Sequence, residues 1–221
     1  EAHLIEDIEA DYFGFQVSTF QIDELVRDAD TLPITDAIAT AGILRTSAKV
    51  IGLAAQFWIR FLQARGNEGR FPLMPDSFSQ RGANGEQQPT SHGESYEALD
   101  SALGQLESEI DVFSAKIPEA DSVVRRIRQT RFDLGFIIKQ ADRNYVYWLE
   151  KRGRGIFLQA SPVDVSALLQ EKLFDKVDTC VLTSATLSAN GSFDFIRDRL
   201  GLSPAKTNSL TAPSSFDYEK Q

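Results

Sequence analysis

Short hydroxyl side chains gather in the segment Thr183-Ser184-Ala185-Thr186, which follows an apolar run and precedes a stretch with helical spacing. In α/β proteins, ligands bind beyond the carboxyl ends of the sheet strands. Hydroxyl groups at such a strand end can switch hydrogen bonds between a ligand and its surroundings. The same residue types also build turns and cap helices. Taken alone, the four residues favour this structural interpretation.

A second cluster is basic and contains Arg125, Arg126, Arg128 and Arg131. Residues three apart are neighbours on a helix surface, so three of these arginines lie close together if the segment is helical. They could then follow the phosphates of single-stranded DNA. The alternative is that they pair with acidic helices of the same chain. The formal charge of −9 leaves both interpretations open.

Composition excludes several other kinds of site. A single cysteine and two histidines exclude an internal disulfide and a cysteine-based cluster, and we predict no metal site. The sequence pI of about 4.8 shows no overall basic footprint for nucleic acid. There is no run of 18 apolar residues and no signal-peptide pattern, so we expect a cytoplasmic chain without a membrane partner.

Most of the first 136 residues show apolar positions at three- and four-residue steps, which predicts helices. Thr35 is the expected N-cap of the longest of them, and Trp58 and Phe61 are expected in the core of a helical bundle. The polar stretch 76–93 is expected to be a loop. The predicted helices span residues 5–32 with a break at 14–18, 35–65, 96–117 and 119–136.

After about residue 140 the apolar period becomes that of strands. Strands are expected at 145–151 and 155–160 around a Gly-Arg-Gly turn, followed by a helix at 165–174. The run 178–187 predicts a buried strand of the parallel-sheet kind, with Cys180 as a small core residue. A last helix is expected to end at Gly201. The sequence therefore predicts a mainly α chain with an α/β part.

The order of the short motifs resembles the DinG and XPD branch of superfamily 2 DNA helicases. Glu-Ala-His at 1–3 is similar to the end of a DEAH box (motif II), and Ser-Ala-Thr at 184–186 is similar to motif III. Between and after them stand Pro-Val-Asp-Val at 162–165, Leu-Gly-Leu at 200–202 and Ser-Phe-Asp-Tyr at 215–218. The family usually has Ser-Pro-Phe-Asp in the last motif, and Ser215 takes the place of the proline.

This resemblance implies a domain plan. The end of motif II would occupy residues 1–4, and a helical Arch-like insert residues 5–135. The remainder of a first RecA-like P-loop NTPase motor domain, with motif III, would occupy 136–204, and the start of a second motor domain 205–221. Because the chain begins inside the DEAH box, we expect a fragment of a longer protein.

The resemblance also implies roles. Glu1 would polarise the water that attacks the γ-phosphate, and His3 would help couple nucleotide state to domain movement. Ser184, Ala185 and Thr186 would form the coupling motif. The parent would use ATP and Mg²⁺, and an iron–sulfur cluster could lie outside this chain. We expect no cofactor in the fragment itself.

By this resemblance the parent would couple ATP hydrolysis to movement along single-stranded DNA, from 5′ to 3′, in DNA repair or replication stress. The phosphate-binding sequence G-x-x-x-x-G-K-[ST] is missing from these 221 residues. The fragment is therefore expected to be inactive alone, with its Arch-like part shaping the DNA path and offering a surface for protein partners. The alternative is a helical protein-interaction module on an α/β scaffold, with no motor.

Overall fold

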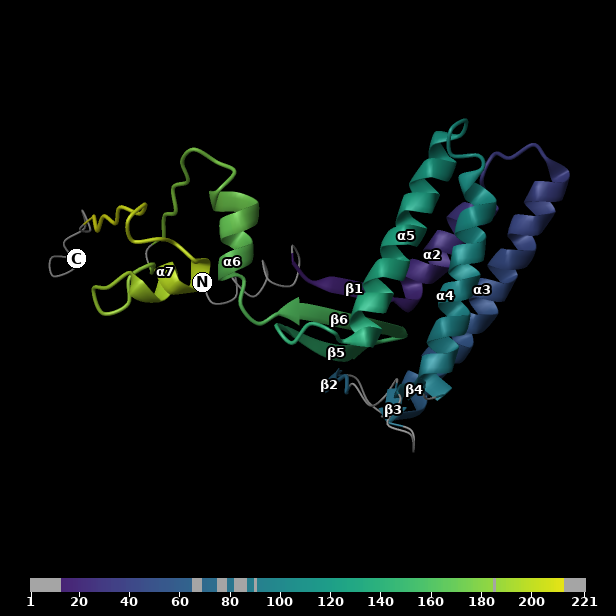
Figure 1. Ribbon diagram of the computed structural model, residues 1–221, viewed down its shortest axis with the longest axis horizontal. Coiled ribbons are helices and arrows are strands. Elements are labelled where there is room, and N and C mark those ends of the chain that lie inside the picture. Colours follow the sequence, from purple (N-terminus) through teal and green to yellow (C-terminus); the bar gives the residue numbers. More distant parts are fainter. Residues whose placement is uncertain are drawn as a thin grey trace, which may run out of the picture. The chain divides into compact units, whose positions relative to one another are not determined.

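The computed structural model describes residues 13–64, 69–74, 79–81, 87–89, 91–184 and 186–212. It divides into two compact units (Figure 1). The helical unit comprises Gly14–Ser161, and the terminal unit comprises Glu1–Phe13 with Pro162–Gln221. The helical unit ends at residue 161, and the domain boundaries expected from the motifs stay predictions.

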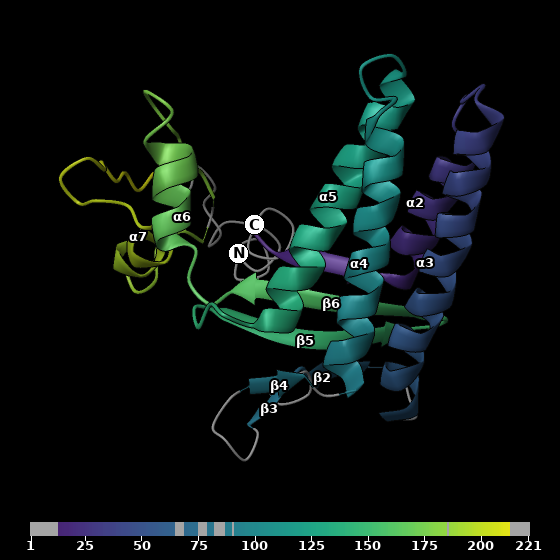
Figure 2. The ribbon, with the colours of Figure 1, turned by 45° about the vertical axis from the view of Figure 1, so that its right-hand side comes forward.

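Four helices form the body of the helical unit and lie alongside one another in both views (Figures 1 and 2). They are α2 (Thr19–Asp30), α3 (Ala37–Ala64), α4 (Ser91–Asp111) and α5 (Pro118–Lys139). α3 packs against both α2 and α4, and α5 packs against α2 and α4. Trp58 and Phe61 are buried in the core, as predicted. The fully buried large side chains of this core include Ile22, Leu25, Phe57, Leu99, Leu103, Leu106, Ile110, Ile127, Leu134 and Ile137.

The ends of the helices follow local capping chemistry. Ser18 caps α2 by accepting a hydrogen bond from the Gln21 amide at 3.2 Å. The predicted cap Thr35 was wrong, because Asp36 accepts from the amides of Ile38 and Ala39 at 2.9 and 3.0 Å. A carboxylate accepts these bonds one residue later than expected, so α3 begins at Ala37.

A four-stranded antiparallel sheet lies beside the helices, in the order β1-β6-β5-β2 (Figure 2). The predicted hairpin is present as β5 (Tyr145–Arg152) and β6 (Gly155–Pro162). The predicted break before α2 is instead the edge strand β1 (Phe15–Ser18), in which Val17 pairs with Leu158. The other edge strand, β2 (Gly69–Pro72), pairs antiparallel with β5. Within the predicted loop 76–93, β3 (Ser79–Arg81) pairs with β4 (Gln87–Pro89).

The terminal unit contains short helices around a small core of Val165, Leu169 and Leu200. α6 (Ser166–Leu169) continues as the π-helical segment η2 (Gln170–Phe174), which matches the predicted helix. α7 (Asp194–Leu200) ends at Gly201, whose φ of 68° is the left-handed conformation that suits glycine.

The predicted strand at 178–187 was wrong for the residues that the structure describes. Residues 178–184 have no strand assignment, Val181 is 82% exposed, and Cys180 is exposed rather than part of a core. A buried parallel strand needs neighbouring strands on both edges, and the described part of the terminal unit contains none. The described fold is therefore mostly helical with a small antiparallel sheet, and no P-loop motor domain is evident in it.

Candidate functional site

Part of the expected catalytic set lies outside the described residues, namely Glu1, His3 and Ala185. Ser184 and Thr186 are described and exposed in the terminal unit. Their hydroxyl oxygens lie 3.4 Å apart, and the Thr186 amide donates to Ser184 Oγ at 3.3 Å. This is the local turn geometry of serine and threonine. The coupling role expected of these residues stays a prediction.

The arginine cluster is described in full, and each of its members has carboxylate partners. Arg125 lies 3.3 Å from Asp121 on its own helix. Arg126 turns to α2, where it donates to Asp28 and lies 4.0 Å from Glu24. The predicted cluster is therefore divided between different neighbours.

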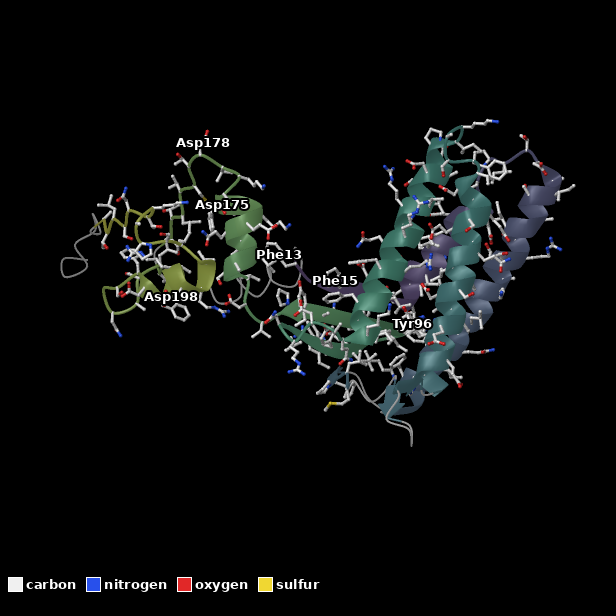
Figure 3. The ribbon with its side chains drawn as sticks, viewed as in Figure 1. Phe13, Phe15, Tyr96, Asp175, Asp178 and Asp198 are labelled. Carbon is white, nitrogen blue, oxygen red and sulfur yellow. The ribbon has the colours of Figure 1, made fainter. Side chains whose placement is uncertain are left out.

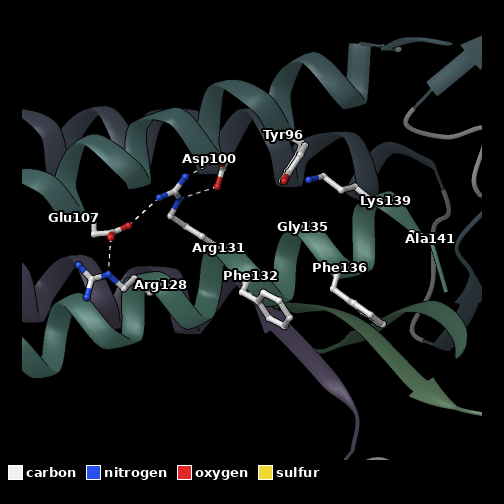
Figure 4. Close-up of a pocket in the computed structure, with 10 residues that line it drawn as sticks. All are labelled: Tyr96, Asp100, Glu107, Arg128, Arg131, Phe132, Gly135, Phe136, Lys139 and Ala141. Atoms are coloured by element: carbon white, nitrogen blue, oxygen red, sulfur yellow. Dashed lines mark hydrogen bonds and ion pairs between the residues drawn. The ribbon is translucent and has the colours of Figure 1, made fainter. Parts of the chain in front are cut away.

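Arg128 and Arg131 remain together because they share Glu107 of α4 (Figure 4). Arg128 Nε donates to one oxygen of Glu107 at 2.7 Å, and Arg131 Nη1 donates to the other at 2.8 Å. Arg131 also forms a two-bond pair with Asp100, at 2.8 and 3.1 Å, and Arg128 lies 3.3 Å from Asp111. These pairs connect α5 to α4, since the three carboxylates all belong to α4.

The carboxylates further favour the charged form that both guanidinium groups already have. Hydrogen bonding to Asp100, and then to Glu107, raises the pKa of Arg131. Hydrogen bonding to Glu107 raises the pKa of Arg128. Glu107 is the better buried partner, with a side chain 15% exposed against 52% for Arg128. The two positive charges are thus fixed in place and largely balanced.

These residues line one side of an open groove of about 520 Å³ between α4 and α5 (Figure 4). Two glycines, one on each helix, leave room for side chains that line the groove. A Cβ at Gly104 would lie 3.1 Å from the Arg131 guanidinium, and a Cβ at Gly135 would lie 3.1 Å from the Tyr96 hydroxyl. Both contacts are tighter than side chains normally make, so glycine leaves the space that Arg131 and Tyr96 occupy.

Aromatic residues and a lysine line the other part of the groove. Phe132 is 60% exposed, and Phe136 lies one helical turn further on. Lys139 extends toward Tyr96 (Figure 4). Burial, and then the charge of Asp100, raises the pKa of Tyr96, so its hydroxyl stays protonated. An exposed ring beside cations is a combination that can stack on a nucleotide base and contact its phosphate.

Neither Phe132 nor Tyr96 was selected from the sequence as a site residue. In the sequence Phe132 is one more apolar position of α5, but the buried residues of this helix include Ile127, Leu134 and Ile137 and not Phe132. Phe132 lies outside the buried stripe of α5, and this offset is the signal in the sequence that its ring is exposed. On its inner side Phe132 contacts Phe15 of β1, whose position Figure 3 shows, with ring centroids 5.9 Å apart.

Comparison with known proteins identifies several related enzymes. No protein-family model matches the sequence. The ATP-dependent DNA helicase YoaA of Haemophilus influenzae is 25% identical over 221 residues, which is 100% of this chain and 32% of that protein. YoaA of Escherichia coli is 26% identical over 222 residues, again 100% of this chain and 32% of that protein. The 3′-5′ exonuclease DinG of Bacillus subtilis is 33% identical over 85 residues, 37% of this chain and 9% of that protein.

The chain is thus homologous over its whole length to ATP-dependent DNA helicases. Its relatives include YoaA and DinG proteins, which confirms the resemblance to DinG-like helicases drawn from the motifs. The chain spans about a third of the length of the YoaA proteins.

Proposed function

We propose that this chain is part of an ATP-dependent DNA helicase that couples ATP hydrolysis to movement along single-stranded DNA in DNA repair or replication. The observation that carries the proposal is homology to YoaA proteins along the entire chain. The order of the short motifs agrees with it. In this proposal the helical unit is the Arch-like insert, so its end moves from residue 135 to residue 161.

The terminal unit would carry the coupling motif. Ser184 and Thr186 present short hydroxyls on an exposed turn, where they can exchange hydrogen bonds with a nucleotide-bound partner domain. Glu1 would orient and deprotonate the attacking water, and His3 would face motif III. ATP with Mg²⁺ would supply the phosphoryl chemistry in the longer protein.

The purified chain 1–221 is expected to hydrolyse no ATP, with or without single-stranded DNA, because its sequence lacks a phosphate-binding loop. Phosphate release measured over a range of ATP concentrations checks this expectation. DNA-stimulated turnover by the chain alone would contradict it.

In the longer protein, the double substitution Ser184→Ala with Thr186→Ala is expected to lower DNA-stimulated kcat for ATP by about tenfold or more. Such a loss corresponds to about 1.4 kcal/mol of barrier. The KM for ATP should change little, because the motif couples rather than binds. Ser188→Ala, which removes a neighbouring hydroxyl, is the matched control. Equal losses in both variants would contradict a coupling role.

The helical unit would contact DNA through the α4–α5 groove. Arg128 and Arg131 are balanced there by Glu107, so phosphates would have to compete with this carboxylate. Phe132 and Lys139 are the exposed groups that could make the first contact. This assignment keeps two of the four predicted arginines and adds an aromatic ring.

Glu107→Gln is expected to tighten binding of single-stranded DNA to the chain and to steepen its dependence on salt. The substitution removes the carboxylate shared by both arginines, while Asp111 and Asp100 still hold them in place. Each additional phosphate contact adds about 0.7 to the slope of log K against log salt for a single strand. Glu119→Gln is the matched control, because it changes the net charge equally at an exposed position of α5. If log K falls with log salt at the same slope in both variants, single-stranded DNA does not bind along the α4–α5 groove.

A non-motor interaction module stays the second candidate, favoured by the pairing of all four arginines with carboxylates. Sequence upstream of Glu1 separates the two candidates. A helicase requires an Asp immediately before Glu1 and a phosphate-binding loop further upstream. Absence of both would leave the interaction module.

A further inference from the structure

The outer face of α3 is apolar although it points away from the core of the helical unit. The inner face is buried through Ile43, Val50, Ala54 and Phe57. Opposite them, residues at alternating three- and four-residue steps are exposed or half-exposed, and Ile38 and Ile59 at the two ends are 85% and 49% exposed. We call the following set the outer α3 face: Ile38, Ala41, Arg45, Ala48, Gly52, Ala55 and Ile59.

A helix that is apolar all round is normally buried all round. Over Ala37–Ile59, α3 is apolar and long enough to cross a membrane by length and composition alone, yet only 28% of its most apolar window is buried. α2 and α4 cover its inner side and its flanks. The outer side of α3 is therefore as apolar as a buried surface, yet no part of the chain that the structure describes packs against it.

Charge distinguishes what could cover this face. The 28 residues of α3 contain no Asp or Glu, although the chain has 32 of them, and its charged residues are Arg45, Lys49 and Arg60. Arg45 is exposed on the outer α3 face, and Lys49 flanks it, with its Nζ 3.3 Å from Gln105 of α4. The face is thus mostly apolar, with one exposed arginine on it and Lys49 at its margin, inside an acidic protein.

We propose that the outer α3 face binds an amphipathic helix of a partner protein, with an apolar stripe flanked by Asp or Glu. Small side chains along the face allow the two helix axes to approach closely, toward the lower end of the usual 8–10 Å. At Gly52 a Cβ would meet no atom within 4 Å, so the centre of the face is open. Carboxylates of the incoming helix would then lie beside Arg45 and Lys49.

Two other occupants fit the face less well. A second copy of α3, packed antiparallel about Ala48, would bring both copies of Arg45 and Lys49 together with no carboxylate on either helix. A lipid surface favours helices that present large apolar and aromatic side chains. Here the aromatic residues Phe57, Trp58 and Phe61 are buried in the core. The outer α3 face is mostly alanine and glycine, and the large apolar residues Leu44 and Ile51 beside it are only 45% and 38% exposed.

The proposal can be tested with a synthetic amphipathic peptide that carries leucines on one face and glutamates beside them. The chain is expected to bind this peptide and to bind the same peptide with lysines at least tenfold more weakly. Gly52→Glu, which places a carboxylate at the centre of the face, is expected to weaken binding of the acidic peptide at least tenfold. Because glutamate favours helix more than glycine does, Gly52→Glu should retain or raise Tm.

Several results would overturn the proposal. One is equal binding of the acidic and the lysine-bearing peptide, and another is unchanged binding of the acidic peptide by the Gly52→Glu variant. The others are self-association of the chain, or its binding to anionic lipid vesicles, if Gly52→Glu abolishes either. In the longer protein, an Ala48→Cys thiol that resists labelling without any partner would show that the protein covers its own α3. None of these outcomes depends on ATP hydrolysis, so the inference stands or fails separately from the helicase proposal.

Discussion

Phe57→Ala is expected to lower the free energy of unfolding of the helical unit by about 3–5 kcal/mol, the cost of emptying a large aromatic site in a core. Phe57 on α3 is fully buried, and its ring packs edge-on against Trp58 and Phe61, with centroids 5.0 and 5.1 Å away. Removing it leaves a cavity that the surrounding aromatic rings cannot fill without leaving their own contacts. The loss would be a large share of the stability of a domain of this size.

Denaturant unfolding followed by tryptophan fluorescence measures this loss, since both tryptophans of the chain, Trp58 and Trp148, belong to the helical unit. Phe132→Ala is the matched control. It removes the same side chain at a position 60% exposed, where a loss of about 1 kcal/mol or less is expected. Equal losses at the two positions would contradict the packing of α3 against α2 and α4.

Asp133→Asn is expected to stabilise the helical unit at neutral pH, by at most about 3 kcal/mol. Asp133 is a buried carboxyl on α5 that accepts a hydrogen bond from Gln129 Nε2 at 2.7 Å. Burial raises its pKa from the ordinary 3.8 to about 6, and the hydrogen bond from Gln129 opposes this rise. A buried charge without a cationic partner costs stability, and asparagine removes the charge while its oxygen can still accept the bond.

The sign of the pH dependence follows from the raised pKa. Between pH 3.8 and about 6 the folded state holds more protons at Asp133 than the unfolded state does, so its contribution to stability falls as the pH rises. Above about pH 6 Asp133 is ionised in both the folded and the unfolded state, and the full cost of burying its charge is present. The stability difference between Asp133→Asn and the unsubstituted chain should therefore be near zero at about pH 4, grow through this window and become constant above it.

Denaturant midpoints measured for both proteins from pH 4 to pH 8 would show this step. Gln129→Met removes the hydrogen bond that lowers the Asp133 pKa, so the upper end of the step should move to higher pH. A stability difference that is the same at every pH would show that Asp133 does not ionise at a buried position.

Local periodicity predicted most of the helices and the β5–β6 hairpin, because the apolar pattern that marks each of these elements lies within its own stretch of sequence. Some helix boundaries are also set locally, as Pro118 at the start of α5 and Gly201 after α7 show. The strand β1 was not predicted, because its hydrogen-bond partners lie in β6, more than 130 residues later. The run 178–187 was predicted as a strand but is not one among the described residues, since apolarity alone provides no partner strand.

The arginine cluster shows most directly what the tertiary structure decided. Sequence alone determined that four arginines lie close together on one helix, and it left open whether they bind phosphates or carboxylates. The structure shows each of them beside carboxylates, three of the four paired across helices, with Asp28 of α2 lying 98 residues from Arg126. The order of the short motifs can be read from the sequence without any knowledge of the fold, and it indicated the family. The groove and the outer α3 face depend on which helix sides pack together, and only the assembled bundle decides that.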